Sequence, residues 1–359
     1  MVHHLTNIID KKYPLCSVIV VNYNGKDLLK KFMPSILKMK YPNFEVILVD
    51  NASKDNSVNT VKKEFPNVNI IQNNKNDGTA EGSNIGLSIA KGDYILWLSN
   101  DMELEPDFLT NLINLANSSK DIGVCTCKMK RITEKGEKLN EIDSVGADLD
   151  IFGFPSSRGI NKIDKGQFDQ PSEVFFSFGG ALLIKKSVLN LVGGYDPLFF
   201  TLADDIDLCW RVRLAGYRIM VQPSAVLYHR VSATLSKWKR SERRFISERN
   251  TFRTLLKNYS LLSLLKILPR YFGLIIAEVS FFAIRKPEMT ISYFRAIFWN
   301  MRNLKDTWLR RQKIQSIRTI SDNTIMSYML DQPTKLLILK EFMASYSTGT
   351  LRKYLGEQP

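Results

Sequence analysis

Asp101 is the first residue whose position indicates chemistry, because it closely follows an apolar run. Residues Tyr94 to Leu98 (YILWL) have the composition of a buried strand, and a helix is expected to begin after Pro106. A carboxylate at the carboxyl end of a buried strand is costly unless something uses it. In an open α/β sheet, ligands bind beyond those strand ends. The stretch therefore indicates a seat for a divalent metal and its phosphates, or else an ordinary capped strand-to-helix turn.

A second acidic group, Asp204 and Asp205, stands at the start of another expected helix. That helix continues from Leu208 to Leu214 and ends at Gly216. One acidic residue would suit the positive end of the helix dipole. Two adjacent carboxylates are one more than a cap needs. Like charges held so close raise the pKa of one of them, which suits a general base.

Short apolar runs alternate with helical patterns through the first part of the chain. This alternation predicts an α/β fold with a mostly parallel sheet flanked by helices. The polar residues that end the strong strands would line up along one edge of that sheet. These strand-end residues are Tyr23, Asp50 and Asp101, and a later strand ends in His229.

The glycine spacing argues against two common nucleotide sites. Gly78, Gly82 and Gly86 fit neither the dinucleotide fingerprint G-x-G-x-x-G nor a P-loop, which needs Gly-Lys-Ser/Thr. Loop flexibility and close helix packing explain these glycines without a cofactor. NAD and P-loop ATP chemistry are therefore disfavoured.

The cysteines and the N-terminus indicate the compartment. Cys125 and Cys127 share one face of an expected strand, and no second pair supplies the spacing of a zinc site. Together with Cys16 and Cys209 they are expected to be buried free thiols in a reducing compartment. The first ten residues are polar and lack the apolar segment of a signal peptide. We therefore expect a cytoplasmic protein.

The basic charge of the chain is confined to its C-terminal third. The formal net charge of the 359 residues is +14. Residues 1–229 carry 26 Lys and Arg against 27 Asp and Glu, whereas residues 230–359 carry 24 against 9. This asymmetry predicts an anionic partner, either nucleic acid or a membrane surface. No nucleic-acid recognition motif accompanies the charge, so we expect no nucleic-acid partner.

The C-terminal third combines that charge with large apolar side chains. The cleanest apolar stretch, Tyr271 to Ile284, contains Glu278 and is shorter than the roughly 20 residues of a transmembrane span. Residues 290–320 form a basic amphipathic pattern that is typical of helices on anionic bilayers. We therefore expect peripheral attachment to the inner face of the cell membrane. Alternatively, the apolar side packs on the rest of the chain or on a second subunit of a homo-oligomer.

Seven segments of the chain, taken in order, carry a resemblance to a known family. They are SVIVVNYNG (17–25), EVILVDNASKDNS (45–57), EGSNIGLSIAKGDYILWLSND (81–101), GGALLI (179–184), VGGYDPLFF (192–200), DDIDLCWRVRLAGYRI (204–219) and AVLYH (225–229). In this order and spacing they resemble the family 2 glycosyltransferases, which have the GT-A fold. The nearest branch is the rhamnosyltransferase-like and cell-surface polysaccharide enzymes, whose acceptors are often lipid-linked.

The resemblance implies a role for each residue at the expected nucleotide site. Tyr23 would lie against the nucleotide base, Asp50 would bind the base or the ribose, and Val21 would contribute backbone contacts. Asn84 would lie near the diphosphate. Asn100 belongs to the turn that would bind the metal and the diphosphate.

The resemblance also implies a metal site. Asp101 matches the last aspartate of the family's DxD motif, in which Ser99 replaces the first acid. Related members carry Asn-Asn-Asp, so one carboxylate would suffice with the diphosphate and water, or Glu103 would supply a second. His229 matches a late histidine that can complete the metal shell. The implied cofactor is Mg²⁺ or Mn²⁺.

The implied reaction is the inverting transfer of a sugar. Asp205 matches the catalytic base of the family's Glu-Asp pair, and Asp204 takes the place of the glutamate. The donor would be a UDP-, GDP- or dTDP-sugar, and the acceptor a hydroxyl of a glycan that is expected to be lipid-linked. The Gln-x-x-Arg-Trp motif of the processive synthases is absent, which favours one sugar per acceptor over a polymer.

The expected organisation is a GT-A catalytic domain over residues 1–235 and a basic amphipathic helical region over 236–359. Two other classes stay open. A sugar-1-phosphate nucleotidyltransferase would need a Gly-rich basic loop after the first strand, of which residues 22–26 (NYNGK) are a poor version. A non-catalytic basic protein that binds membranes or nucleic acid would not need the acidic strand ends.

Overall fold

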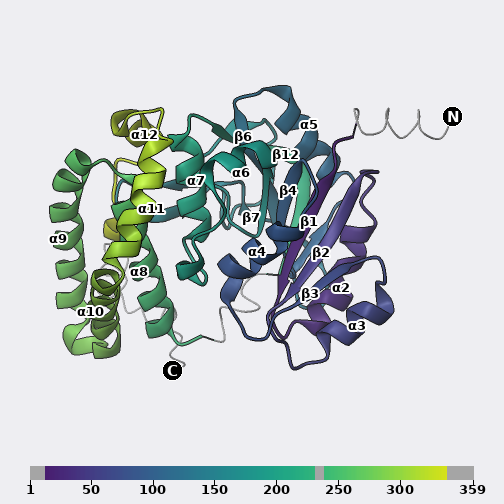
Figure 1. The fold of residues 1–359 in the computed structure, drawn as a ribbon, viewed down its shortest axis with the longest axis horizontal. Helices are drawn as coiled ribbons and strands as arrows, with labels where there is room; N and C mark the ends of the chain where they lie inside the picture. Colours follow the sequence, from purple (N-terminus) through teal and green to yellow (C-terminus); the bar gives the residue numbers. More distant parts are fainter. Residues whose placement is uncertain (1–12, 231–237, 338–359) are drawn as a thin grey trace.

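The computed structural model describes residues 13–230 and 238–337. A twisted sheet forms the centre, with helices on both of its faces, and the C-terminal helices gather at one side (Figure 1). The predicted α/β class is therefore confirmed, and so is a C-terminal helical region. The predicted domain boundary at residue 235 falls in 231–237, outside the described residues.

The main sheet has two halves of different strand direction. Strands β3, β2, β1 and β4 are parallel, whereas β11 runs antiparallel between β4 and β6, and β12 is parallel to β6. The order along its main path is β10-β12-β6-β11-β4-β1-β2-β3. The main strands are β1 (Cys16–Asn22), β2 (Phe44–Asp50), β3 (Asn69–Gln72), β4 (Tyr94–Ser99), β6 (Ile122–Ile132), β11 (Ala181–Lys185) and β12 (Arg218–His229).

Short strands extend the sheet beside β12 and β6. β5 (Met102–Leu104) pairs with the end of β12, and β7 (Lys138–Ser144) pairs with β6. β10 (Ser172–Glu173) pairs with β12 near its start. β8 (Ala147–Leu149) and β9 (Pro155–Ser157) form a separate hairpin. All of these short strands are antiparallel to their partners.

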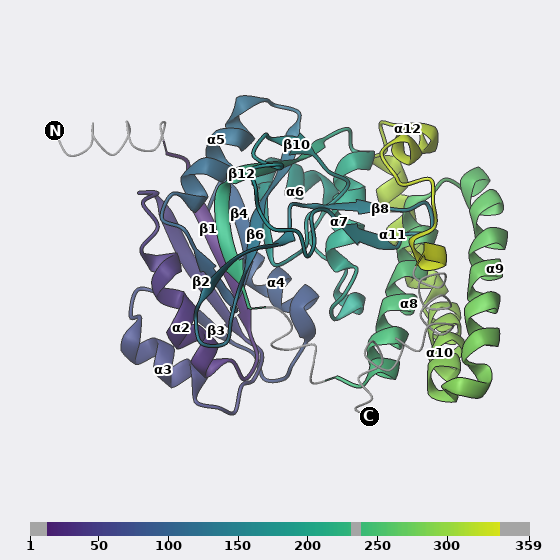
Figure 2. The ribbon, with the colours of Figure 1, turned by 180° about the vertical axis from the view of Figure 1, so that it is seen from behind.

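The strands are apolar on both sides because helices cover both faces of the sheet. Along β1, Val18 and Val20 point to one buried cluster and Ile19 points to the other. Helices α2 and α5 pack on the first face, and α4, α6 and α7 pack on the second (Figure 2). The helices around the sheet are α2 (Lys26–Leu37), α3 (Ser57–Glu64), α4 (Gly78–Ile89), α5 (Phe108–Ser118), α6 (Lys186–Val192) and α7 (Asp204–Leu214), with the 3₁₀ turn η1 (Pro197–Phe199) before α7.

All four cysteines are buried free thiols, as predicted. Burial raises the pKa of Cys125 and of Cys209 to about 12. Cys16 and Cys127 are also buried, and their pKa values are raised further by the same cause.

The C-terminal helices share their core with the sheet. Leu255 and Tyr259 of α8 belong to the same buried cluster as Trp210 of α7, and the rings of Trp210 and Tyr259 lie 4.8 Å apart. The helices are α8 (Arg240–Asn258), α9 (Leu261–Arg285), α10 (Pro287–Arg302), α11 (Leu304–Ser316) and α12 (Asp322–Ser327). Their apolar side therefore packs in part on the rest of the chain.

Two buried carboxylates, Asp207 of α7 and Asp196 just before η1, bind α8 to the segment that carries the second acidic group. Lys257 Nζ of α8 lies 2.6 Å from Asp196 Oδ2 and 2.9 Å from Asp207 Oδ1. Arg253 Nε lies 2.8 Å from the same oxygen of Asp196. Burial alone would raise the pKa of both carboxyl groups. The neighbouring cations outweigh burial and hold both pKa values below their usual range.

Some of the basic residues that the sequence assigns to the surface lie inside the protein. Arg253 and Lys257 are fully buried, and Arg311 of α11 is nearly so. The guanidinium of Arg311 donates to the carbonyl oxygens of Leu256 and Tyr259, at 2.6 and 2.5 Å, near the C-terminus of α8. The excess of positive charge therefore serves the interior as well as the surface.

Helix α9 is longer than the sequence predicted. It continues for 25 residues through Pro269, and residues 261–284 are long and apolar enough to cross a membrane by length and composition. It is the one such helix in the described part of the chain. One side of α9 packs inward through Tyr271, Ile275 and Glu278, whose carboxylate accepts from Lys335 Nζ at 2.6 Å. The opposite side is exposed.

We expect Lys257→Met to lower the free energy of unfolding by about 3–5 kcal/mol, the usual effect of leaving a buried charge without its partner. Asp196 and Asp207 would both lose a cation in that variant. Lys305→Met, at an exposed site of α11, is the control and should change the same quantity by about 0.5 kcal/mol or less. Urea denaturation at neutral pH measures both. Equal losses in the two variants would contradict this role.

Candidate active site

A row of hydrogen bonds joins the carboxyl ends of three neighbouring strands. Asn100 Nδ2, just beyond β4, donates to Asn22 Oδ1 of β1 at 2.8 Å. Asn22 Nδ2 in turn donates to Asp50 Oδ1 of β2 at 3.0 Å. A Cβ on Gly25 would collide with the side chains of Asn22 and Asn100, so this position needs glycine. The parallel register, which pairs Asn22 with Asp50, brings the row together.

Asp50 is fully buried at the centre of this row. Its Oδ2 accepts from the backbone N–H of Ser53 at 2.9 Å, which shapes the turn after β2. Tyr23, by contrast, is 47% exposed beside Asn22 and offers an open aromatic face. Val21 is half-buried. A Cβ at Gly82 of α4 would lie 2.9 Å from the Cγ1 atom of Val21, so helix and strand pack closely here. This edge of the sheet therefore has the exposed ring of Tyr23 next to a row of hydrogen-bonded polar side chains.

Asn84 of α4 lies in the same region and connects two elements. Its Nδ2 donates to the carbonyl oxygen of Tyr195 at 2.9 Å, and its Oδ1 accepts from the N–H of Tyr195 at 2.9 Å. Its Nδ2 also lies 3.1 Å from Glu81 Oε2. Asn84 therefore joins α4 to the segment that leads into η1. Its predicted place near a diphosphate stays a prediction.

Asp101 and His229 meet because β5 pairs with the end of β12. Met102 stands opposite His229 in that ladder, which brings His229 Nε2 to 3.5 Å from Asp101 Oδ2. The other ring nitrogen, Nδ1, lies 2.8 Å from Asp143 Oδ2 of β7. The imidazole is therefore held between a carboxylate of the turn after β4 and a carboxylate of β7. Burial alone would lower the pKa of His229, but these two partners outweigh it and raise the pKa to about 10.

This group suits a cation that is shared with phosphate. Asp101 Oδ1 is buried and has no hydrogen-bond partner among the described residues. A carboxylate oxygen and an imidazole nitrogen are both ligands of Mn²⁺ and similar ions. No cluster of three or more His, Cys, Asp or Glu in residues 13–230 and 238–337 could hold a metal. A metal at Asp101 would therefore need oxygen ligands from phosphates and water as well.

Asp204 and Asp205 open α7, and both are only partly buried. Asp205 Oδ2 accepts from the N–H of Gly179 at 2.8 Å, and its Oδ1 accepts from the N–H of Ile206 at 2.8 Å. Burial raises the pKa of Asp205. Burial, together with the charge of Asp205, raises the pKa of Asp204 to about 7. The pair therefore has the proton affinity of a general base near neutral pH.

Two glycines join the acidic pair to the turn that holds Asp101. Gly179 binds Asp205, and the carbonyl oxygen of the next residue, Gly180, accepts from the N–H of Ser99 at 2.9 Å. A Cβ on Gly180 would collide with the side chain of Met102. The Gly179–Gly180 dipeptide thus connects the Asp204–Asp205 pair to the turn of Asp101.

The loop that precedes α7 has an uncommon backbone. Phe200, Leu202 and Ala203 all have positive φ angles, of 65°, 66° and 60°. Non-glycine residues avoid this region, and each one costs on the order of 1 kcal/mol or more unless the surroundings hold it. Such clustering is common at active sites.

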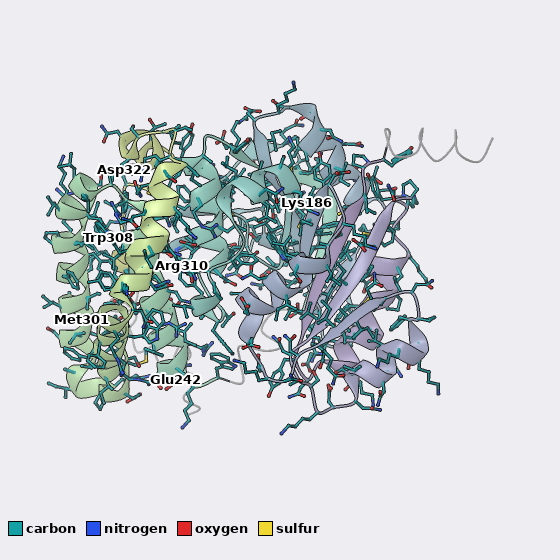
Figure 3. The ribbon with its side chains drawn as sticks, in the orientation of Figure 1. Lys186, Glu242, Met301, Trp308, Arg310 and Asp322 are labelled. Atoms are coloured by element: carbon teal, nitrogen blue, oxygen red, sulfur yellow. The ribbon has the colours of Figure 1, made fainter. Side chains whose placement is uncertain are left out.

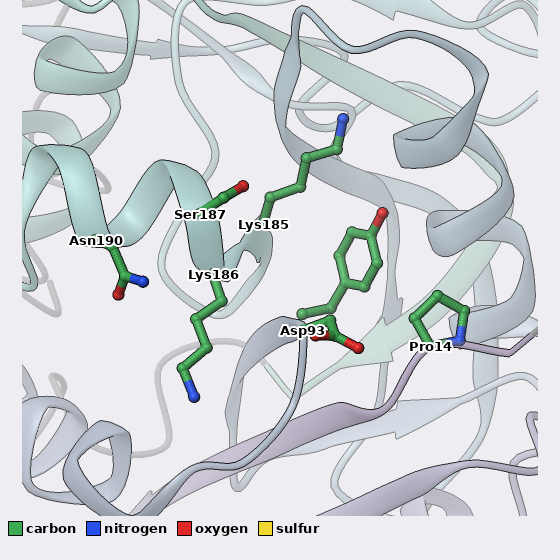
Figure 4. A pocket seen from close by; sticks show the side chains of 7 residues that line it. Pro14, Asp93, Lys185, Lys186, Ser187 and Asn190 are labelled. Atoms are coloured by element: carbon green, nitrogen blue, oxygen red, sulfur yellow. The ribbon is translucent and has the colours of Figure 1, made fainter. Parts of the chain in front are cut away.

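A surface pocket lies at the opposite end of the sheet. Pro14 and Asp93 precede β1 and β4, so this pocket is at the amino ends of these strands (Figure 4). The amines of Lys185 and Lys186 donate to the carbonyl oxygens of Ser119 and Ala90. These lysines have structural partners, and the pocket has no connection to the acidic groups.

Three residues of the site were missed by sequence reasoning. Asn22 lies in the turn NYNG, in which the sequence predicted a role only for Tyr23. Asp143 opens a polar stretch without a motif, and only the pairing of β7 with β6 brings it to His229. Gly179 was noted as part of GGALLI, but its N–H bond to Asp205 has no signal in the sequence.

Comparisons with known proteins agree on one family. The profile "Glycosyl transferase family 2" matches residues 17–192, and "Glycosyl transferase family group 2" matches residues 154–302. Poly-beta-1,6-N-acetyl-D-glucosamine synthase of Staphylococcus aureus (strain MSSA476) is 28% identical over 224 residues, which are 62% of this chain and 51% of the synthase. The chain thus spans about half the length of the curated relatives it matches.

Two solved structures share the fold. TarS 1–349 of S. aureus, in complex with UDP-GlcNAc, has a TM-score of 0.54 at 18% identity, and the match covers 84% of this chain and 90% of TarS. GalNAc-T7 with UDP, GalNAc and Mn²⁺ also has a TM-score of 0.54, at 17% identity, over 69% of this chain and 48% of that protein. The fold is thus GT-A-like, which confirms the predicted fold class.

The chain belongs to the family 2 glycosyltransferases, as the seven segments predicted. This family assignment sets aside the sugar-1-phosphate nucleotidyltransferase.

We expect Asp143→Asn to lower the pKa of His229 by at least one unit, because the imidazolium loses one of its two carboxylate partners. The chain has only three histidines, so an NMR pH titration of the ring protons resolves them. Asp164→Asn removes a carboxylate that pairs with Lys128 instead and is the matched control. A His229 that titrates alike in wild type and Asp143→Asn would show that Asp143 does not hold the ring.

Proposed function

We propose that this protein transfers one sugar from a nucleotide-sugar donor to a hydroxyl of a glycan acceptor, with inversion at the anomeric carbon. One observation carries the proposal. The Gly179–Gly180 dipeptide joins Asp205, a carboxylate with a raised pKa, to the turn that holds Asp101, and Asp101 in turn contacts His229 at the end of β12. A base thus stands beside a site for a metal and a diphosphate, which are the two requirements of inverting transfer.

The donor nucleotide would bind along the row of strand-end residues. Tyr23 offers an exposed ring for the base, and the backbone of Val21 lies beside it. Asp50, which is hydrogen-bonded to Asn22 and Ser53, would bind the base or ribose after a small movement of the turn that follows β2. Asn100 would face the diphosphate from the turn before Asp101. TarS binds UDP-GlcNAc with the same fold, so UDP-GlcNAc is the first donor to test, followed by GDP- and dTDP-sugars.

The leaving diphosphate needs its charge neutralised. Asp101 and His229 would hold Mn²⁺ or Mg²⁺, with Asp143 orienting the imidazole. When bound, the metal would stabilise the negative charge that develops on the diphosphate oxygens. The uncommitted Oδ1 of Asp101 supports this role.

The acceptor hydroxyl needs to lose a proton as it attacks. Asp205 would accept that proton while the hydroxyl oxygen forms its bond to the anomeric carbon and the bond from that carbon to the diphosphate breaks. Attack from the face opposite the diphosphate inverts the carbon, and no covalent sugar–enzyme intermediate is needed. The N–H groups of Gly179 and Ile206 hold the carboxylate of Asp205 in place. Asp204 would keep the proton affinity of the pair high.

The acceptor is proposed from the relatives and from the C-terminal surface. The synthase of S. aureus is named for a poly-N-acetylglucosamine product, which supports a glycan acceptor. On α9, the outward side chains Leu262 and Leu265 are 74% and 73% exposed. The charged residues beside them on that side are basic, Lys266 and Arg270.

Large apolar side chains are also exposed on the next two helices. Figure 3 labels Met301 of α10 and Trp308 of α11 on the C-terminal bundle, away from the sheet. Their side chains are exposed, as are those of Ile291, Phe294, Phe298, Leu304 and Leu309. We infer that this surface docks on the cytoplasmic, anionic face of the cell membrane, next to a lipid-linked acceptor.

We expect Asp101→Asn to weaken the Mn²⁺-dependent binding of UDP by at least tenfold and to leave the fold intact. The variant removes the charge of a carboxylate whose Oδ1 is buried without a hydrogen-bond partner among the described residues. Isothermal titration calorimetry with UDP, with and without Mn²⁺, measures the effect. Glu103→Gln is the matched control, because that carboxylate pairs with Lys138. Unchanged affinity in Asp101→Asn, or an equal loss in Glu103→Gln, would remove Asp101 from its proposed role.

We expect Asp205→Asn to keep UDP affinity within about twofold and to lower the transfer rate by 10²–10⁴-fold, the usual scale of general base catalysis. In the wild type, transfer should rise with pH through a midpoint above the usual range of a carboxyl group, because burial raises the pKa of Asp205 and the base acts only without its proton. A rate for Asp205→Asn close to that of the wild type would sink the assignment.

We expect the intact protein to float with anionic liposomes at low salt and to dissociate as salt rises, because each Lys or Arg near the surface contributes about 1 kcal/mol. The double variant Leu262→Glu/Leu265→Glu should lose flotation, and Ile160→Glu, at an exposed site outside the C-terminal helices, should keep it. Resistance to alkaline carbonate would instead indicate that α9 crosses the bilayer. A protein that never floats would point to a second subunit on this surface, which sedimentation velocity would detect.

A further inference from the structure

The C-terminal helix α8 holds the strained loop that leads into the catalytic pair. Asn250 is fully buried, and its Nδ2 donates to the carbonyl oxygens of Phe199, Thr201 and Leu202 at 3.0, 2.9 and 2.7 Å. One amide group therefore contacts the backbone on both sides of Phe200. Asp204 follows Leu202 by two residues.

Arg249 sets the orientation of that amide. Its Nε donates to Asn250 Oδ1 at 2.9 Å, so the nitrogen of the amide is the atom that faces the loop. Its Nη2 donates to the carbonyl oxygens of Leu198 and Phe199, at 3.1 and 2.7 Å. The guanidinium lies over the ring of Trp299, 4.5 Å from its centre. The two carbonyl oxygens and the ring of Trp299 together hold the guanidinium of Arg249 in one orientation.

The remaining carbonyl of the strained segment is held from the other side. The oxygen of Phe200 accepts from the N–H of Ala80 in α4 at 3.2 Å. The loop is therefore fastened between α4, which lies at the nucleotide edge, and α8. Below the loop, Lys257 and Asn258 of α8 bind Asp207 Oδ1, at 2.9 and 3.0 Å. Contacts from α8 thus lie on both sides of Asp204 and Asp205 along the chain.

Positive φ angles at Phe200, Leu202 and Ala203 are unfavourable for these side chains, so outside contacts must hold the loop. We propose that Asn250, oriented by Arg249, is a positioning residue for the Asp204–Asp205 pair: its amide holds the left-handed loop that directs Asp205 toward the acceptor hydroxyl. This inference rests on the proposed role of Asp205 as the base. It gives the C-terminal region a part in catalysis that is separate from membrane docking.

Four variants test the proposal, the last of them in reserve. Asn250→Ala removes the donor to the loop. Thr254→Val is the matched control, because Thr254 lies one turn further along α8, is buried, and its hydroxyl has no partner among the described residues. Ala203→Gly, added to Asn250→Ala, removes the penalty of the left-handed conformation at the start of α7. Should Asn250→Ala not fold, Arg249→Lys removes the orienting bond and keeps the charge over Trp299.

The first readout is hydrogen exchange of the backbone amides of residues 199–206, which requires no substrate. We expect exchange at least tenfold faster in Asn250→Ala than in the wild type, and no change in Thr254→Val. The second readout is transfer from UDP-GlcNAc to the same glycan acceptor for every variant, including Asp205→Asn. We expect kcat to fall ten- to a hundredfold, the KM of the donor to stay within twofold, and Ala203→Gly to restore part of the loss.

The outcomes separate this inference from the proposed function. Unchanged exchange in Asn250→Ala would overturn the inference, as would faster exchange with unchanged kcat. Equal losses of kcat in Thr254→Val would also overturn it, because the effect would then be general destabilisation. If Asp205→Asn keeps its transfer rate, the proposed base is wrong, and the inference falls with it. If Asp205→Asn loses transfer and Asn250→Ala does not, only the positioning role is wrong.

Discussion

The burial of charge between α7 and α8 is the constraint on which the arrangement of the site depends. Asp196 and Asp207 have almost no access to water, and a lone carboxylate there would be strongly destabilising. Lys257 and Arg253 neutralise them from α8. The helix that carries the proposed base therefore cannot take its place without the helix that follows the catalytic fold. The C-terminal region and the sheet form one unit in this sense, whatever else the exposed surface of that region binds.

Charged groups near Asp101 also depend on partners of opposite charge, and here the partner is a histidine. The imidazolium of His229 lies between the carboxylates of Asp101 and Asp143, which neutralise its charge and leave one negative charge in excess. A metal at the proposed site would replace the imidazolium proton that faces Asp101, and Asp143 would stay to orient the ring.

Much of this could be predicted from the sequence, because the signals are local. Apolar runs that end near Asp50, Asp101 and His229 indicate buried strands whose carboxyl ends meet. The parallel register of β1, β2 and β4 brings Asp50 and the turn of Asp101 to one edge, and the pairing of β5 with β12 brings His229 to Asp101. The family followed from seven ordered segments. The length of α9 was underestimated because a proline and an arginine interrupt its apolar pattern, yet Pro269 lies inside a continuous helix.

The parts that could not be predicted depend on contacts between distant segments. Asp143 and His229 are 86 residues apart, and only the pairing of β6 with β7 and β12 brings them together. Nothing in the sequence distinguishes Asn250 from other polar residues of a basic helix. Its role depends on the carbonyl oxygens of the loop before α7, to which it donates. The basic residues of α8 read as surface charge, because the sequence does not reveal the buried carboxylates opposite them.

The four cysteines have a practical consequence for the study of this enzyme. Each thiol is buried, and its raised pKa keeps it in the unreactive protonated form at neutral pH. A single cysteine introduced on the exposed side of α9 would be the one thiol in the folded protein open to a maleimide dye. Fluorescence from such a label would report the depth of that helix in a lipid bilayer without any change to the native cysteines.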